Sequence, residues 1–371
     1  MFNFNQYNKI KFITKEYEKL LHAQGWNVKW ELSSRCSCWK DEYGEPDINC
    51  TVCRGRGYFY TRPHLATVSE EKASILTQGR IKVINAPSRV IRVWNKAQGI
   101  EYEILEVAGN EIIIPDANLL NHYGLFVEYE YELSKTYTET VHVSPFKKDE
   151  VIVKHKYIDE IISIQNITTG DPYTALYFTD DKVKLSMEAN VIDQIIVTYI
   201  AISPIKMIMT DVKENKYSKP TGEFVEGDAN VTFMPWFNIG ERDKLTIMHD
   251  EVVTRYVDLL KRGGAETLKM DTIVKIMEVR DLVRTYIENV DYKMVGTHKI
   301  EWLDSNVYPN AQHPDQGEQY SVMYLARREY CVWGEVPQER HHGEVLLPRR
   351  LLARKLEKVN FIRDASFSNG A

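Results

Sequence analysis

An internal repeat constrains the fold of this 371-residue chain more than any other feature of its sequence. Residues 89–116 (RVIRVWNKAQGIEYEILEVAGNEIIIPD) align without a gap on residues 160–187 (EIISIQNITTGDPYTALYFTDDKVKLSM). Three pairs match at an offset of 71: Asn95 with Asn166, Gly99 with Gly170, and Tyr102 with Tyr173. Self-similarity at a fixed period indicates one supersecondary unit used more than once. We therefore expect two copies of one module.

Each copy has the pattern of antiparallel β-structure. Its apolar and polar residues alternate, as in strands with one buried face. The Asn and Gly positions between the strands predict turns. The closing strands, LFVEYEYEL and IIVTYIAIS, align at an offset of 70, and EQYSVMYLA at 318–326 resembles both, which suggests a diverged third copy. We expect each copy to be a small β-sandwich or barrel.

The predicted fold class is mainly β, with tandem small antiparallel β modules, an N-terminal helix and a zinc-knuckle segment. The helix is expected within residues 8–25, and the stretch 250–264 fits either a helix or a pair of strands. The predicted segments are an N-terminal helix and lead-in (1–34), a zinc knuckle (35–62), two β modules (63–135 and 136–205), a larger β region (206–335) and a basic C-terminal arm (336–371) that could include a short helix.

Four of the five cysteines lie within residues 35–57 (RCSCWKDEYGEPDINCTVCRGRG). Their spacing is C-x-C-x11-C-x2-C, and the four are Cys36, Cys38, Cys50 and Cys53. The N-terminus shows no secretory signal, so we expect a reducing compartment, where clustered cysteines more often bind metal than form disulfides. Two close pairs can surround one ion tetrahedrally, and we predict a structural zinc site.

Other interpretations of these cysteines remain open. They could be four reduced thiols or a labile disulfide. A thioredoxin-like redox role is disfavoured because no βαβ pattern surrounds the C-x-x-C. A catalytic zinc is disfavoured because four sulfur ligands leave no position for water. The stretch CTVCRGRG resembles one unit of the cysteine-rich domain of J-domain co-chaperones, and this resemblance implies only the metal chemistry.

No catalytic motif is present in the sequence. Phosphate-binding, dinucleotide-binding, metalloprotease and nucleophile-elbow patterns are all missing, so we expect no enzymatic activity. Cys331 lies in an apolar strand pattern and is expected to be a buried core thiol. The net charge of −6 argues against nucleic-acid binding over the whole surface.

Three segments carry a resemblance to virion structural proteins of tailed bacteriophages. They are RCSCWKDEYGEPDINCTVCRGRGYFY, GEQYSVMYLARREYCVWGEVPQER and LPRRLLARKL. The resemblance is to neck, head–tail connector or baseplate components. It implies a non-enzymatic protein that forms a symmetric homo-oligomeric ring, contacts other virion proteins and no membrane, and resides in the virion after assembly in the bacterial cytoplasm. The basic arm would then dock on a neighbour.

Two alternative functions come from other classes. A zinc-ribbon nucleic-acid-binding protein would use Arg35, Arg54 and Arg56, although the acidic residues between the cysteine pairs offset their charge. A carbohydrate-binding or host-binding β protein would use exposed aromatic side chains. The candidates are Trp94, Trp236 and Trp302, and for each of them a place in the core is the favoured expectation.

Overall fold

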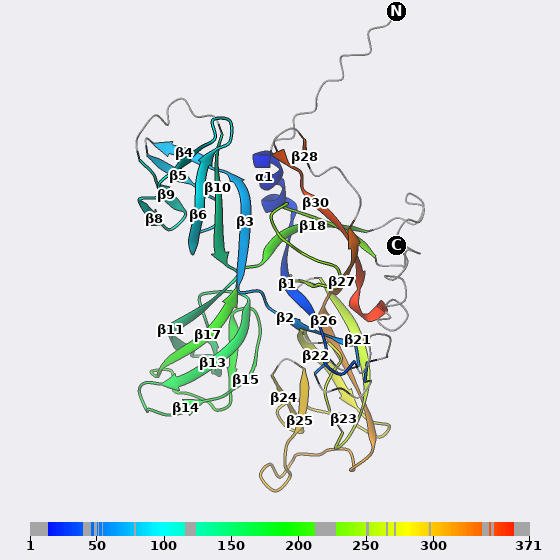
Figure 1. Cartoon of the computed structure of the whole chain (residues 1–371). Coiled ribbons are helices and arrows are strands. Elements are labelled where there is room, and N and C mark those ends of the chain that lie inside the picture. Colours follow the sequence, from blue (N-terminus) through cyan, green and yellow to red (C-terminus); the bar gives the residue numbers. More distant parts are fainter. Residues whose placement is uncertain are drawn as a thin grey trace, which may run out of the picture. The chain divides into compact units, whose positions relative to one another are not determined.

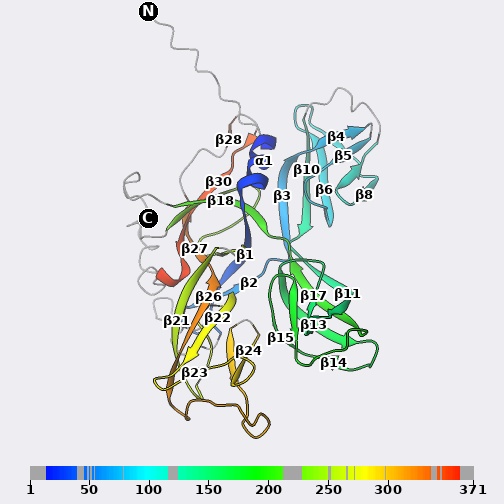
Figure 2. The same ribbon diagram turned by 180° about the vertical axis from the view of Figure 1, so that it is seen from behind.

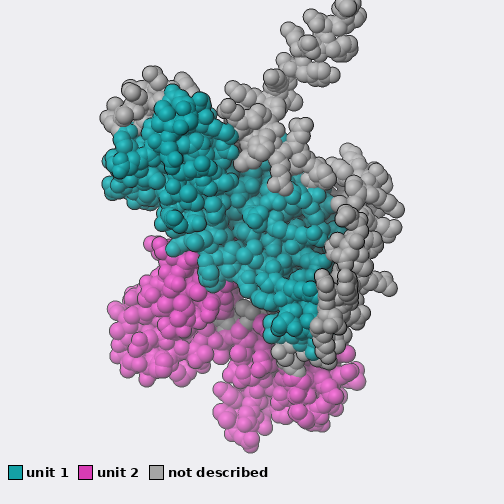
Figure 3. All heavy atoms as spheres, viewed as in Figure 1, with its two compact units in different colours: residues 1–133, 205–245, 329–371 teal, residues 134–204, 246–328 magenta. Residues whose placement is uncertain are grey.

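The chain divides into two compact units, each assembled from separate stretches of sequence (Figure 3). Unit 1 comprises residues 1–133, 205–245 and 329–371, and unit 2 comprises residues 134–204 and 246–328. The computed structural model describes residues 14–39, 46–47, 50, 52–53, 55–77, 79–115, 124–211, 228–249, 252–264, 266–270, 272–296, 298–335, 341–342 and 345–359. These residues are mainly in β-strands, which confirms the predicted fold class.

The described residues contain one α-helix, α1 (Thr14–Gln24), as the sequence predicts. Leu21 is buried, whereas Leu20, expected on the same face, is 40% exposed. The helix ends at Gly25, whose N–H donates to the Leu21 carbonyl at 2.8 Å. A Cβ at Gly25 would lie 2.3 Å from that same oxygen, so the close turn requires glycine.

A closed β-barrel forms the body of unit 1 (Figure 1). Its strands pair in the order β18-β19-β30-β27-β20-β1, and β1 pairs back onto β18. Pairing every strand on both sides removes the exposed sheet edge. The strands are β1 (Trp26–Arg35), β18 (Ile205–Asp211), β19 (Ala229–Phe233), β20 (Lys244–Ile247), β27 (Glu329–Glu335) and β30 (Arg349–Lys355). β2 (Tyr58–Thr61) extends the sheet from β1.

Module 1 (residues 65–132) belongs to unit 1 and has two four-stranded sheets. The first sheet has the order β3-β10-β6-β7 and contains β3 (Leu65–Lys72), β10 (Leu125–Glu132), β6 (Arg89–Asn95) and β7 (Ile100–Tyr102). The second has the order β4-β5-β9-β8 and contains β4 (Ser74–Thr77), β5 (Arg80–Lys82), β9 (Glu111–Ile113) and β8 (Glu106–Ala108).

Module 2 (residues 134–202) belongs to unit 2 and follows the same plan with a longer first strand. β11 (Ser134–Ser144) takes part in both layers, in the order β14-β13-β17-β11-β12-β16-β15. The other strands are β12 (Lys147–Ile152), β13 (Ile158–Asn166), β14 (Pro172–Tyr173), β15 (Ala175–Phe178), β16 (Lys182–Leu185) and β17 (Gln194–Ile202).

The pairing registers of the two modules agree residue by residue. Val93 lies between Val127 and Tyr102 in module 1. Ile164 lies between Val197 and Tyr173 in module 2. These are the positions that the sequence offsets of 71 and 70 relate, so the predicted repeat is confirmed as a structural repeat.

Module 3 (residues 253–327) is a third copy, in unit 2. Its main sheet has the order β21-β26-β22-β23, with Val279 between Val322 and Tyr286. The strands are β21 (Val253–Lys261), β22 (Ile273–Arg280), β23 (Thr285–Tyr286) and β26 (Gln319–Arg327). β24 (Tyr292–Val295) and β25 (Lys299–Trp302) form a hairpin. The stretch 250–264, whose sequence fits either a helix or a pair of strands, therefore contains one strand, β21. In both Figure 1 and Figure 2 the strands of each module lie together as one group.

A buried tyrosine on the closing strand of each module donates its hydroxyl to a carboxylate on the first strand. The pairs are Tyr129 with Glu71 at 2.5 Å, Tyr199 with Glu139 at 2.7 Å, and Tyr324 with Asp258 at 2.8 Å. In each module the same carboxylate also accepts a backbone N–H at 2.8 Å, from Ile84, Lys154 and Lys269 respectively. The shared motif therefore ties the first strand, the closing strand and a following loop together.

A polar turn residue also recurs at one position in all three modules. Asn95, Asn166 and Asp281 each accept two backbone N–H groups with a side-chain oxygen. Gly99 and Gly170 follow with φ of 67° and 83°, in the left-handed region that favours glycine. The prediction that these Asn and Gly residues serve turn chemistry is confirmed.

The C-terminal segment differs from the expected helical, solvated or docking arm. Residues 349–355 form β30, a barrel strand that pairs with β19 on one side and β27 on the other. Leu351, Leu352 and Ala353 are buried there. Two of its basic residues form ion pairs within the barrel: Arg354 contacts Asp228 at 3.2 Å and Arg349 contacts Glu335 at 3.3 Å. A short 3₁₀ helix, Leu356–Lys358, follows, and residues 360–371 lie outside the described part.

We expect the free energy of unfolding of module 1 to depend on pH because of the Glu71 carboxyl. Burial raises its pKa to about 7, and hydrogen bonds from Tyr129 and Ile84 oppose this shift only in part. A folded pKa above the unfolded value of about 4.5 gives stability that is complete below pH 4.5 and lost as the pH rises through about 7. We expect the free energy of unfolding to fall by up to about 3 kcal/mol from pH 4.5 to 8. Urea unfolding of Glu71→Gln, which cannot ionise, should show a correspondingly smaller slope; an unchanged slope would contradict the assignment.

Candidate metal centre

The four clustered cysteines lie in the segment that connects β1 to β2. The two strands pair from Leu32 opposite Thr61 to Arg35 opposite Tyr58. The Cys36 N–H then donates to the Gly57 carbonyl at 2.8 Å, which continues the ladder by one step. The hairpin thus brings the start and the end of the cysteine segment together.

The four sulfur atoms converge on one point. The Sγ atoms of Cys36 and Cys50 are 3.7 Å apart, and those of Cys38 and Cys53 are 3.4 Å apart. All four ligand atoms lie within 4.8 Å of one another. A tetrahedral ion with metal–sulfur bonds of about 2.3 Å would separate its ligands by about 3.8 Å. The spacing is also too long for a disulfide, and all four thiols are free.

Backbone N–H groups point at two of the sulfurs. The Gly57 N–H donates to Cys53 Sγ at 3.3 Å. Hydrogen bonds from the N–H groups of Cys53 and Val52 lower the pKa of Cys50 to about 7. Such donors favour the thiolate, which is the form that ligates metal. The chemistry of the donor set therefore fits a thiolate-bound ion.

Trp39 packs over the turn that carries these donors. Its Nε1–H donates to the Gly57 carbonyl at 2.6 Å, and its ring meets Tyr58 edge to face at 6.1 Å. Gly57 has a φ of 77°, and a Cβ there would lie 2.5 Å from Trp39 Nε1. Glycine is therefore required at position 57 both by the backbone conformation and by the indole.

The arrangement can hold one metal ion, closed by four protein sulfurs. Cys36 and Cys53 are buried, and Cys38 and Cys50 are half-buried. With four sulfur ligands the ion would have no open coordination position for water or substrate, as in structural rather than catalytic sites. The prediction that these four cysteines lie close together is thus confirmed.

The remaining cysteine, Cys331, is a core thiol, as predicted. It lies on β27, fully buried, and burial raises its pKa to about 12. Its Sγ is 3.7 Å from the Arg242 carbonyl oxygen. A thiol held in its protonated form inside the barrel is inert as a ligand or nucleophile.

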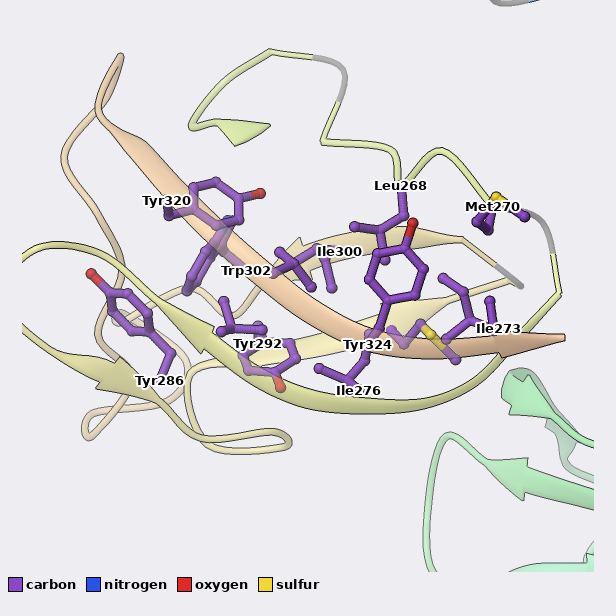
Figure 4. Packing of buried hydrophobic residues seen from close by; sticks show 14 residues of the cluster. Leu268, Met270, Ile273, Ile276, Tyr286, Tyr292, Ile300, Trp302, Tyr320 and Tyr324 are labelled. Carbon is purple, nitrogen blue, oxygen red and sulfur yellow. The ribbon is translucent and has the colours of Figure 1, made fainter. Parts of the chain in front are cut away.

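The tryptophans considered for glycan binding are mostly core residues. Trp236 and Trp302 are buried. Trp302 lies between the rings of Tyr286 at 4.8 Å and Tyr320 at 5.1 Å, in the core of module 3 (Figure 4). Trp94 is half-buried, with the Arg92 guanidinium 4.2 Å from the centre of its ring. The favoured expectation of a core place is therefore confirmed for Trp236 and Trp302.

Of the arginines considered for nucleic-acid binding, Arg35 makes a side-chain contact within the hairpin region. The Arg35 guanidinium stacks over the Trp39 ring at 4.6 Å from its centre. Arg56 also has interactions in the structure. Arg54 and the acidic residues Asp41, Glu42 and Glu45 lie outside the described residues.

A buried cluster of charged residues, which the sequence pattern did not reveal, lies beside the hairpin. Lys244 on β20 is almost fully buried, with its Nζ 2.8 Å from Glu31 on β1 and 4.0 Å from Glu329 on β27. Burial disfavours the Glu31 carboxylate, but Lys244 and Lys29 more than offset this and lower its pKa. The three residues are far apart in sequence, so only the closed barrel brings them together. Removing one charge would leave the others buried and uncompensated.

Comparisons with known proteins identify no relative. No protein-family model matches the chain, and no curated protein matches it significantly. Among the described residues, no helix has the length and apolar character needed to cross a membrane.

Replacing Gly57 with alanine should weaken metal binding. Gly57→Ala adds a Cβ that collides with Trp39 and displaces the N–H aimed at Cys53. We expect a loss of metal affinity of about 10–100-fold, as for other residues that orient ligands. Competition with a chromogenic chelator measures it.

Gly99→Ala is the matched control. Gly99 also has a positive φ, 67°, but nothing lies within 4 Å of its Cβ position. It should cost about 1–2 kcal/mol of stability and leave metal affinity unchanged. Equal effects of the two variants on metal affinity would contradict the role of Gly57.

Proposed function

We propose that this protein is a non-enzymatic structural component of a bacteriophage particle that assembles as a ring in the neck or head–tail connector, in contact with other virion proteins. A place in the baseplate is the variant of the same proposal. The observation that carries it is the threefold use of one β module in a chain that also contains a closed barrel. Repeated modules with equivalent cores and different surfaces suit a protein whose task is to contact neighbours.

The segments that resemble phage proteins support this proposal through their place in the fold. The first segment includes the four cysteines and β2, the second includes β26 and β27, and the third includes β30. All three segments therefore contribute strands to the sheets. The third segment was expected instead to be a terminal arm that docks on a neighbour. Because β30 is one of the barrel strands, we assign the contacts with neighbouring proteins to the outer faces of the modules.

We propose that zinc occupies the four-cysteine site. Four thiolates in a near-tetrahedral set match the preference of zinc for sulfur ligands and four-coordination. The connection between β1 and β2 is too short to bury a core of its own, and a bound ion would supply the missing stabilisation. The zinc would thus hold the hairpin that continues a barrel strand.

The two alternative functions gain no support from the site. A nucleic-acid interface would need cations free of intramolecular contacts, and Arg35 is stacked on Trp39. A glycan platform would need exposed aromatic rings, and two of the three candidate tryptophans are buried.

The purified chain should contain one equivalent of zinc. Elemental analysis measures the metal, and hydrogen exchange of the β1–β2 amides reports the loss of the hairpin on chelation. Cys53→Ser should lose the zinc, whereas Cys331→Ala, which removes a thiol outside the site, should retain it. Less than about half an equivalent of zinc, with unchanged exchange after chelation, would rule out structural zinc.

The phage role predicts that the protein is part of the finished particle. Mass spectrometry of purified virions should detect the chain, and antibody labelling in electron micrographs should place it between head and tail for a neck protein, or at the tail end for a baseplate protein. Particles made without it should accumulate as unjoined heads and tails in the first case. Its absence from purified virions would refute the proposal.

A further inference from the structure

The three modules differ sharply on the outer face of their main sheet. Because the Tyr–carboxylate motif fixes the equivalence of positions, the outward residues on the first and closing strands can be compared directly. Module 1 has Glu70, Lys72, Glu128 and Glu130; module 2 has Thr138, Thr140, Thr198 and Ile200; module 3 has Val257, Leu259, Met323 and Leu325. The same scaffold thus carries a charged, a mainly polar and an apolar face.

The apolar face of module 3 is exposed. Val257 and Leu259 on β21 are 62% and 66% accessible, and Met277 on β22 is 50% accessible. Met277 is the extra residue of a bulge that the module shares with the other two, where the same position is Ile91 or Ile162. A contiguous apolar strip across neighbouring strands, rather than single exposed residues, is typical of an interaction surface.

Basic residues border this strip. Arg255 and Lys275 lie on either side of Leu325. Arg280 lies opposite Ser321 and pairs at 4.0 Å with Glu278, an acidic residue opposite Met323. Lys261 continues the row on β21. Arg255, Lys261 and Lys275 form no ion pair with the described carboxylates. Two such faces brought together would set like charges against one another, which disfavours a self-complementary dimer.

An acidic row lies on the closing strand of module 1, with Arg89 opposite Glu130 and Lys72 opposite Phe126 on the neighbouring strands. β10 presents Glu128, Glu130 and Glu132 in a row, beside the half-buried Phe126. Arg92 pairs with Glu128 at 2.6 Å, whereas Glu130 and Glu132 form no ion pair within the described residues. Carboxylates in a row beside an aromatic side chain complement an apolar strip with a cationic border.

We propose that the outer face of module 3 binds the outer face of module 1 of a second copy of this chain. Different patches meet in such a contact, so it is heterologous, and it propagates to a ring when the rotation closes. This inference rests on the proposed ring assembly and names the surface that builds it. The apolar strip supplies the buried area, and Arg255 and Lys275 against Glu130 and Glu132 set the register.

Sedimentation velocity of the full-length chain over a wide concentration range tests the surface. Leu259→Asp places a charge at the most exposed residue of the strip and should raise the dissociation constant by about tenfold or more. Thr140→Asp makes the equivalent change in module 2 and should leave self-association as in the wild type. Both positions face solvent, and thermal unfolding followed by circular dichroism verifies that each variant is folded.

Charge reversal tests the identity of the occupant. Lys275→Glu and Glu130→Lys should each weaken self-association. A mixture of the two single variants should recover by alternation, because the glutamate introduced at position 275 of one variant then meets the lysine introduced at position 130 of the other, and the native Lys275 meets the native Glu130. The double variant should recover towards wild-type affinity. Recovery supports the module 1 partner; a double variant as weak as the single ones refutes it.

Two further results would overturn the inference. One is a wild-type chain that stays monomeric throughout, and the other is an equal effect of Leu259→Asp and Thr140→Asp. Detection of the chain in virions is a separate measurement, so the proposed contact between modules 3 and 1 can be refuted while the phage role is supported. The phage role can likewise fail while self-association through these faces is observed.

Discussion

A hydrogen bond from a buried tyrosine to a carboxylate organises every module of this protein, and the carboxylate is buried in modules 1 and 3. A carboxylate taken out of water is costly unless its oxygens are satisfied. Tyr324 and a backbone N–H together meet this need for Asp258, and the same partners recur around Glu71 and Glu139. Because the donors come from the closing strand and a loop, the carboxylate is stable only when both are in place. The motif therefore selects one register of the sheet, since a one-residue slip would turn the carboxylate to the opposite face.

This fixed interior leaves the outer face free to vary. In all three modules the strand beside the closing strand carries a bulge at the same place, and the following turn is closed by Asn95, Asn166 or Asp281. Bulge and turn set the local twist without using the outward side chains. The outer residues can then be charged in module 1 and apolar in module 3 with equivalent backbones. A protein built to contact several neighbours gains distinct surfaces in this way from a single core design.

The cysteine hairpin meets a different constraint. The segment between β1 and β2 contains too few apolar residues for a core, so its order depends on the sulfur cluster and on Trp39 above Gly57. β1 is at the same time a barrel strand that pairs with β18. A metal bound by Cys36, Cys38, Cys50 and Cys53 would thus stabilise the end of a strand on which barrel closure depends. This links the site to the fold and gives it a structural role with no open coordination position.

Local pattern in the sequence was enough to predict the helix, the alternating strands, the repeat and the four cysteines, because each depends on residues close together in the chain or at a fixed offset. The barrel was beyond such reasoning. Its strands come from residues 26–35, 205–247 and 329–355, and their pairing depends on contacts over long separations. For the same reason the basic run at 349–355 was mistaken for an arm, although Asp228 and Glu335 pair with two of its arginines within the sheet. Local residue patterns were sufficient to identify the strands and the thiols that can cluster. Which strands close the barrel, which charges are buried together and which module face remains apolar and exposed follow from the folded chain alone, because burial depends on contacts between distant segments.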